Sequence, residues 1–288
     1  MGSGLTQLSK WHHYVPQGVL SKFCYSGSKF YYFSKNRPAE GVASRDIEKK
    51  FRKRHYYSVT TANGKKSDAL ERNFLQVLDS RFVEFTTSFE DSVNIRKPQK
   101  IDSETREFIQ QFFYYYSIRN PDFSAHFEIY QDPQSELKAA IKSYEQLFGP
   151  VDPDKTRELL EPKKVNELVN FARVQSLANP FKQINEVLSK MNLHFAIAPQ
   201  GKQFLVGSNP VVRLENRKGS LLGDGFVELW SAITPSIAIG FAGPSKNQPE
   251  IISIDRNEVR KINLELFRRS TEIAGANKAL VTSVVGSR

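Results

Sequence analysis

The chain has a single cysteine, Cys24, among its 288 residues. One cysteine excludes an internal disulfide framework and a zinc site made of several cysteines, and it fits a reducing compartment. Long apolar runs are also missing, since none approaches the roughly 20 residues that span a bilayer. The N-terminus lacks the apolar stretch of a secretory signal peptide. We therefore expect a cytoplasmic protein that has no membrane partner.

Two catalytic motifs are absent as well. The sequence contains no glycine-rich phosphate loop and no G-x-S-x-G elbow. The first absence excludes nucleotide hydrolases of the P-loop type, and the second excludes α/β-hydrolases. Cys24 has no thiol-activating neighbours beyond basic residues, so a buried structural cysteine is favoured over a nucleophile.

Positive charge and aromatic side chains are present in excess. The net charge is +10, and the chain has 21 phenylalanines and 11 tyrosines. The aromatic content predicts a packed core, and the charge indicates a polyanionic partner, usually nucleic acid. The cations are densest just before His55-Tyr56-Tyr57, and five of them are predicted to bind substrate: Lys49, Lys50, Arg52, Lys53 and Arg54. The alternative is a solvated charged face.

The order of the predicted elements indicates an α+β fold. An aromatic strand at 29–34 comes first, a helical body follows over about 65–192, and a sheet region occupies about 193–288. We predict one domain over 1–288, with a mixed or antiparallel sheet built from N-terminal and C-terminal strands. Within the helical body, Asp102-Ser103 predicts the start of a helix that stops at Asn120-Pro121.

The C-terminal region predicts several strands and one long helix. Strands at 194–198 and 203–207 flank a turn at Gln200-Gly201, and strands at 226–233 and 236–241 are hinged on Thr234-Pro235. Further strands are predicted at 211–214 and 251–254. A helix is expected over 258–274, followed by a closing strand at 279–284.

The segment Trp11-His12-His13-Tyr14-Val15-Pro16-Gln17 carries two adjacent histidines. Pro16 favours extended backbone before it and a helix start after it. Neighbouring residues on an extended segment point to opposite sides, so one histidine can face a pocket while the other packs. We favour His13 for the pocket, as a general base or metal ligand, with Gln17 as a substrate contact. The alternative is one buried structural histidine and one exposed histidine.

Two charged residues of the helical body are candidates for the same pocket. Glu71 lies at the edge of the buried face of its predicted helix, whereas Asp68 and Asp79 lie further towards solvent. Arg119 follows Phe108, Phe112 and Tyr116 at helical spacing, which places it on the buried stripe. A buried guanidinium needs a carboxylate or a phosphate. Structural pairing, for instance with Glu71, and binding of a substrate phosphate both stay open.

Ser208-Asn209-Pro210 follows the apolar strand at 203–207. A polar tripeptide at a strand end is a common place for a binding site, and we predict Ser208 and Asn209 as substrate contacts. An ordinary Asn-Pro turn is the alternative.

These motifs together resemble a mostly bacterial family, catalogued as domain of unknown function 4238. The family typically reads H-H-Y-V-P-Q, then L-x-x-F, as in His12 to Gln17 followed by Leu20 and Phe23. It continues with a glutamate placed like Glu71, an R-x-P placed like Arg119-Asn120-Pro121, and S-D-N-P placed like 207–210. Ser208 stands where the family has aspartate. The H-H-Y-V-P string also resembles the first histidine pair of HNH-type nucleases, but no matching finger follows.

The resemblance implies that these polar residues meet in one pocket, which on a basic protein fits phosphodiester cleavage. The leading hypothesis is an intracellular nuclease that prefers RNA to DNA and serves as a toxin or defence effector. Its catalytic residues would be His12, His13, Glu71 and Arg119. A divalent metal held by a histidine and Glu71 is optional. The alternatives are a non-catalytic module that binds nucleic acid or a nucleotide, and a structural network of buried polar groups.

Overall fold

The structure is a computed structural model that describes residues 9–61, 64–97, 99–127, 131–178, 182–244 and 250–287. Helices occupy much of the stretch between residues 71 and 190, and strands from both ends of the chain form antiparallel and mixed sheets. The α+β prediction is therefore confirmed. Residues 98, 128–130 and 179–181 of the predicted helical body lie outside the described residues. No helix within the described ranges is long and apolar enough to cross a membrane.

The chain divides into two compact units, each assembled from distant stretches of sequence. Unit 1 comprises Met1–His12, Lys53–Gln76 and Phe123–Pro180. Unit 2 comprises His13–Arg52, Val77–Asp122 and Phe181–Arg288. The predicted helical body is thus shared between the units. The prediction of one domain over the whole chain stays a prediction.

Unit 2 contains a five-stranded sheet. Its order is β12-β7-β11-β10-β9, and its neighbours are antiparallel except for the parallel pair β12 and β7. The strands are β7 (Met191–Ile197), β9 (Val212–Glu215), β10 (Val227–Ala232), β11 (Ile237–Pro244) and β12 (Glu250–Ser253). The predicted pair hinged on Thr234-Pro235 is confirmed as β10 and β11. Thr234 Oγ1 closes this turn by accepting the N–H groups of Ser236 at 3.2 Å and Ile237 at 3.0 Å.

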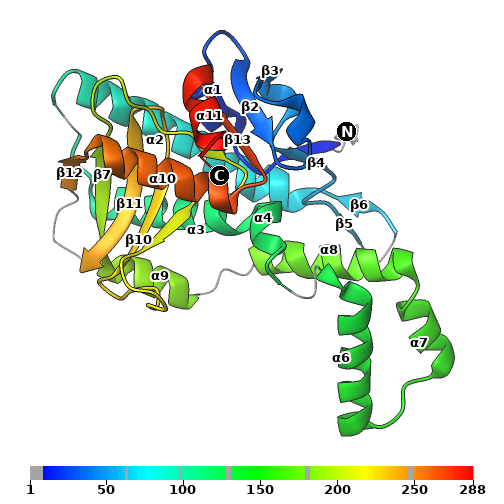
Figure 1. The fold of residues 1–288 in the computed structure, drawn as a ribbon. Helices are drawn as coiled ribbons and strands as arrows, with labels where there is room; N and C mark the ends of the chain where they lie inside the picture. The colour runs from blue at the N-terminus through cyan, green and yellow to red at the C-terminus, as the bar shows by residue number, and fades with distance from the viewer. Residues whose placement is uncertain are drawn as a thin grey trace, which may run out of the picture. The chain divides into compact units, whose positions relative to one another are not determined.

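Helices cover both faces of this sheet. On one face lie α2 (Gln76–Asn94) and α3 (Ser103–Ile118), where Phe89 stacks on Phe195 and Phe113 meets Phe241 edge-on. On the other face lies α10 (Arg256–Arg269), as Figure 1 shows. Its first turn is fixed by a capping box between Asp255 and Glu258. Asp102 caps α3 by accepting the Thr105 N–H at 2.8 Å, as the sequence predicts.

A four-stranded sheet joins the two ends of the chain within unit 2. Its order is β3-β2-β13-β8. The strands are β2 (Lys29–Ser34), β3 (Ala43–Asp46), β8 (Val206–Gly207) and β13 (Glu272–Gly275). The N-terminal strand β2 pairs antiparallel with the C-terminal strand β13, so the predicted sharing of one sheet by both ends is confirmed.

Shorter elements complete unit 2. They are α1 (Gln17–Lys22), η1 (Pro38–Glu40), η2 (Ile47–Lys49), α9 (Lys182–Lys190) and α11 (Lys278–Val285). The α9 helix packs on α3, and α11 packs on β2 and β13.

Unit 1 is organised around α8 (Pro162–Ala178), which packs on α6 (Pro133–Phe148), on α7 (Pro153–Leu159) and on β5 (Val59–Thr60). Asn170 and Arg173 of α8 donate hydrogen bonds to the carbonyls of Ser58 and Tyr56. The other described elements are β6 (Lys66–Ser67) and the π-helical turn η3 (Glu71–Leu75). Three elements cross the unit boundary along the chain: β1 (Trp11–His13), β4 (Arg52–Arg54) and α4 (Pro121–Ser124).

Three local predictions are wrong. The helix predicted over 258–274 ends at Arg269, because Ser270 is extended and the chain enters β13. The closing strand predicted at 279–284 is the helix α11, whose start Asn277 caps by accepting the Leu280 N–H at 3.1 Å. The strand predicted at 203–207 is shortened to β8, Val206–Gly207, which pairs with β13. Short apolar runs fit helix and strand equally, and the caps and sheet partners decide.

Candidate functional site

His12 is fully buried, and the backbone of unit 1 uses both of its ring nitrogens. Nδ1 accepts the Tyr57 N–H at 2.8 Å, and Nε2 lies 3.0 Å from the Ser9 carbonyl oxygen. Because Nδ1 accepts, the proton sits on Nε2 and is donated to Ser9. The ring also stacks on Tyr57, and burial lowers the pKa of His12. This neutral histidine therefore holds two backbone segments together.

Asp68 and Glu71 are both buried within unit 1. Asp68 accepts the Ser9 N–H at 3.0 Å and pairs with Arg72 at 2.6 Å. The prediction that Asp68 lies towards solvent is wrong, because its carboxylate fixes the same N-terminal segment that His12 binds. Glu71 begins η3, where the π-helical turn changes the register on which its predicted position depended.

Arg119 is fully buried in unit 2, as its spacing on α3 predicts. It ends α3, and its Nη1 lies 2.7 Å from Oδ1 of Asp79 on α2. The guanidinium also lies 5.7 Å from the centre of the Phe112 ring and 5.6 Å from that of Tyr116. Asp79 was predicted towards solvent, but its Oδ1 is buried in this ion pair. Arg119 thus has a carboxylate partner, Asp79, as the structural alternative requires.

Ser208 and Asp122 form a second buried polar contact in unit 2. The Ser208 hydroxyl donates to Oδ2 of Asp122, which also accepts the Thr271 N–H at 2.9 Å. The Thr271 hydroxyl donates to Oδ1 of Asp122 at 2.9 Å, and the Glu272 N–H donates to Ser208 Oγ at 2.9 Å. A second carboxylate at position 208 would repel Asp122, whereas the serine donates to it.

Asn209 belongs to the same buried region. Its N–H donates to Ser270 Oγ at 3.1 Å, and the Ser270 hydroxyl lies 3.3 Å from the Asn209 carbonyl oxygen. Both Ser208 and Asn209 are buried, and their predicted contact with substrate stays a prediction.

The Glu272 carboxylate accepts hydrogen bonds from two tyrosines, and the sequence did not predict this cluster. The hydroxyl of Tyr14 donates to its Oε2, and the hydroxyl of Tyr32 donates to its Oε1. Glu272 faces Ser34 across the sheet, so Tyr32 lies diagonally from it on the same face. The Lys50 ammonium lies 4.3 Å from the centre of the Tyr32 ring. Tyr14 stands inside the H-H-Y-V-P-Q segment, but its partner Glu272 falls within the helix predicted over 258–274, so the pairing was not predictable.

The remaining predicted site residues are distributed between the units. Lys49, Lys53 and Arg54 are exposed, and Lys50 and Arg52 are half-buried. Gln17 is exposed at the start of α1, and His13 is half-buried at the end of β1. Unit 1 contains His12, Glu71, Lys53 and Arg54, and unit 2 contains His13, Gln17, Lys49, Lys50, Arg52, Arg119, Ser208 and Asn209. None of the described residues forms a group of three or more metal-ligating side chains.

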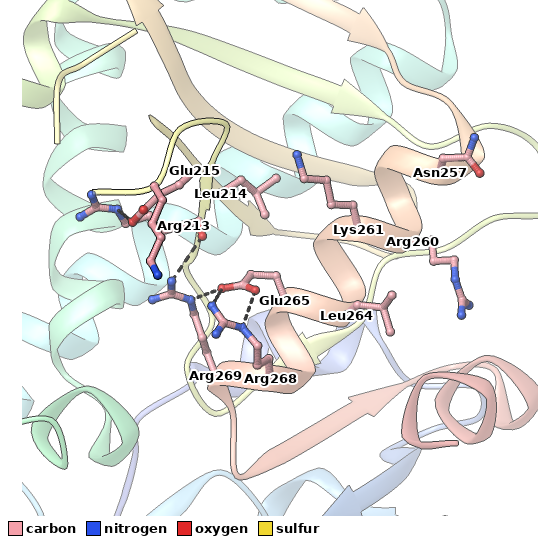
Figure 2. A pocket seen from close by; sticks show the side chains of 11 residues that line it. Arg213, Leu214, Glu215, Asn257, Arg260, Lys261, Leu264, Glu265, Arg268 and Arg269 are labelled. Atoms are coloured by element: carbon pink, nitrogen blue, oxygen red, sulfur yellow. Dashed lines mark hydrogen bonds and ion pairs between the residues drawn. The ribbon is translucent and has the colours of Figure 1, made fainter. Parts of the chain in front are cut away.

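An open groove of about 660 Å³ lies on unit 2 between β9 and α10. Six cationic side chains line it: Arg213, Lys218, Arg260, Lys261, Arg268 and Arg269. Two carboxylates, Glu215 and Glu265, lie among them, and we call this surface the basic groove (Figure 2). None of the predicted site residues lines it. The sequence signal was present but scattered, since four of the cations repeat along one helix, one lies within β9 and one follows it.

The carboxylates of the basic groove hold arginines in place. Oε1 of Glu215 lies 2.9 Å from Arg213 Nε. Glu265 accepts hydrogen bonds from Arg268 at 2.7 and 2.8 Å and also pairs with Arg269. These two arginines keep the pKa of Glu265 below its usual range although burial opposes the shift. Lys218, Arg260 and Lys261 have no carboxylate partner among the described residues.

The tyrosines at Glu272 predict a loss of stability in alkali. Burial and the neighbouring Glu272 charge raise the pKa of both Tyr14 and Tyr32. Their stabilising contribution is therefore complete below the unfolded value of about 10 and is lost as pH rises above it. Tyr14→Phe and Tyr32→Phe should each lower the unfolding free energy at neutral pH by about 1.5–3 kcal/mol and flatten its decline above pH ~10. Urea denaturation between pH 7 and pH ~11 measures both effects.

Tyr144→Phe is the matched control, because that tyrosine is exposed on α6. An alkaline decline that is the same in the wild type and in both tyrosine variants would contradict the assignment.

The family model described as "Protein of unknown function (DUF4238)" matches residues 11–279. No curated protein and no solved structure matches the chain. The matched region contains the histidine segment, Arg119-Asn120-Pro121 and Ser208-Asn209-Pro210, on which the resemblance was based. The chain therefore belongs to the DUF4238 family.

Proposed function

We propose that this protein binds nucleic acid through the phosphate backbone, with the basic groove as the binding surface. The observation that carries the proposal is the gathering of six cations around one open groove of about 660 Å³. Lysine and arginine contacts to phosphates supply most of the sequence-independent affinity of such proteins. The net charge of +10 adds long-range attraction for a polyanion.

The arrangement of charges within the groove suits a chain of phosphates. Glu215 and Glu265 already hold Arg213, Arg268 and Arg269. Their guanidinium groups are thereby oriented before a ligand arrives, which lowers the cost of ordering them on binding. Lys218, Arg260 and Lys261 are exposed and add cations along the groove. A chain of phosphates can therefore meet several positive charges in succession.

Reversing three of the exposed charges should remove most of the binding. We expect Lys218→Glu, Arg260→Glu and Lys261→Glu together to weaken binding of a single-stranded RNA at least tenfold at low salt. The slope of log affinity against log salt should fall in magnitude by about 2, because each lost phosphate contact removes about 0.7. Fluorescence anisotropy with labelled RNA and DNA strands across a salt series measures both quantities.

Two triple variants with the same change in net charge serve as controls. Lys138→Glu, Lys142→Glu and Lys155→Glu alter exposed lysines of unit 1 and should leave binding almost unchanged. Lys49→Glu, Lys53→Glu and Arg54→Glu test the basic segment predicted from the sequence. If that third variant loses binding while the groove variant retains it, the segment and not the groove is the binding surface.

Cleavage of the bound strand, of RNA in preference to DNA and in a toxin or defence role, is the second candidate function. The environment of His13 supports this second candidate function. His13 is half-buried, whereas His12, Glu71 and Arg119 are buried. His12 has both nitrogens bound to backbone, and Arg119 is held by Asp79. The nuclease hypothesis therefore rests mainly on His13 as the general acid or base.

His13→Gln is the decisive substitution for cleavage. A general acid or base contributes about 100-fold or more to the rate, so we expect at least that loss while RNA binding is retained. The control is His126→Gln, because His126 is an exposed histidine of the described chain. Gel assays of RNA and DNA with Mg²⁺, Mn²⁺ or chelator provide the measurement. Intact substrates under all three conditions with the wild-type protein would exclude the nuclease hypothesis.

A further inference from the structure

A second pocket adjoins the basic groove on unit 2. It has a volume of about 390 Å³ and lies between α10 and the face of the five-stranded sheet. Leu214 and Lys261 line both this pocket and the groove, so the two spaces lie side by side. The volume falls within the usual range of small-molecule sites.

Aromatic rings form the floor of this pocket. His194 of β7 and Trp230 of β10 both pair with Gly240 of the central strand β11, so the three residues lie in a row on one sheet face. A Cβ atom at Gly240 would meet the Trp230 ring at 2.3 Å. The indole therefore lies over Gly240, with its ring centre 6.2 Å from that of His194. The two rings are tilted by 39° and Trp230 is buried, so a ligand meets the His194 ring and only a small part of the indole. Aromatic rings contact nucleobases without reading their sequence.

The polar side chains at the rim of this pocket form hydrogen bonds with one another. Oε2 of Glu228 accepts the Trp230 indole N–H at 2.8 Å, and Oε1 accepts from Asn216 Nδ2 at 3.3 Å. The Lys261 ammonium donates to Asn216 Oδ1 at 3.3 Å. Each carboxylate oxygen of Glu228 keeps capacity for a further hydrogen bond. Such oxygens accept from the exocyclic amino groups of adenine, cytosine and guanine, and uracil has no such group.

We infer that this pocket takes a nucleobase whose phosphate lies in the basic groove. The base would pack against the His194 ring and the part of the Trp230 indole that reaches the pocket, and its amino group would donate to Glu228. Lys261 stands where the two spaces meet and would contact the phosphate or sugar. This inference rests on the proposed function and extends it, since it makes one nucleotide of a single strand the unit of recognition. A duplex keeps its bases stacked inside, so the pocket favours single-stranded ligands.

The fluorescence of Trp230 can report ligand binding in this pocket. The chain has two tryptophans, and Trp11→Phe leaves Trp230 as the only one. We expect AMP, CMP and GMP to change the Trp230 fluorescence and to bind at least tenfold more tightly than ribose 5-phosphate, with UMP weaker than the other three. Ala242→Leu should abolish the fluorescence change, because Ala242 lines the pocket and the larger side chain fills it. Ala242→Ser is the matched control and should retain it.

The ligand series separates this inference from the proposed function. Equal affinity for ribose 5-phosphate and the nucleotides, with unchanged Trp230 emission, would overturn the base pocket and leave phosphate binding standing. Binding of an RNA strand without any nucleotide response up to about 10 mM would overturn it in the same way. If the wild-type protein does not bind RNA at all, the proposed function is overturned together with the base pocket.

Discussion

Unit 2 depends on a short run of residues at the start of β13, where Glu272 accepts the hydroxyls of Tyr14 and Tyr32. The preceding Thr271 binds the carboxylate of Asp122, which also holds Ser208. The three stretches of chain that make up unit 2 therefore meet at adjacent residues. Tyr14, Tyr32, Asp122 and Ser208 are buried and Thr271 and Glu272 are half-buried, so little water can replace a missing partner and each group constrains the others. The segment that carries the family's first motif is fixed here by its tyrosine.

This network also determines where the basic groove can form. Arg268 and Arg269 end α10, and the chain passes through Ser270 and Thr271 directly into β13. Ser270 is bound to Asn209, and Thr271 is bound to Asp122. The C-terminal end of α10 is thus held by buried hydrogen bonds while its outer face presents cations. The hydrogen bonds of Asn209 and Asp122 therefore fix the end of α10 that carries Arg268 and Arg269.

Much of the fold was predictable, because the local signals were strong. The aromatic run of β2, the Asp102 cap of α3 and the Thr234-Pro235 turn each specify their element from nearby residues. The ends of α10 and the nature of α11 were not predictable, since apolar periodicity continues across Ser270 and a cap at Asn277 decides the rest. The burial of Arg119 followed from spacing, but its partner Asp79 did not. Pairings such as Tyr14 with Glu272 join residues 258 positions apart, and no local pattern encodes them.

In the proposed function the ligand lies on the basic groove of unit 2, and the motif residues Arg119, Ser208 and Asn209 of that unit have a structural role. Hydrogen–deuterium exchange with and without a saturating single-stranded RNA distinguishes binding at the groove from binding at the motif residues. Binding at the groove should slow exchange in residues 213–218 and 257–269, which line it, and should change exchange little in residues 12–17 and 119–122. Protection confined to residues 12–17 and 119–122, with none in the groove, would contradict it.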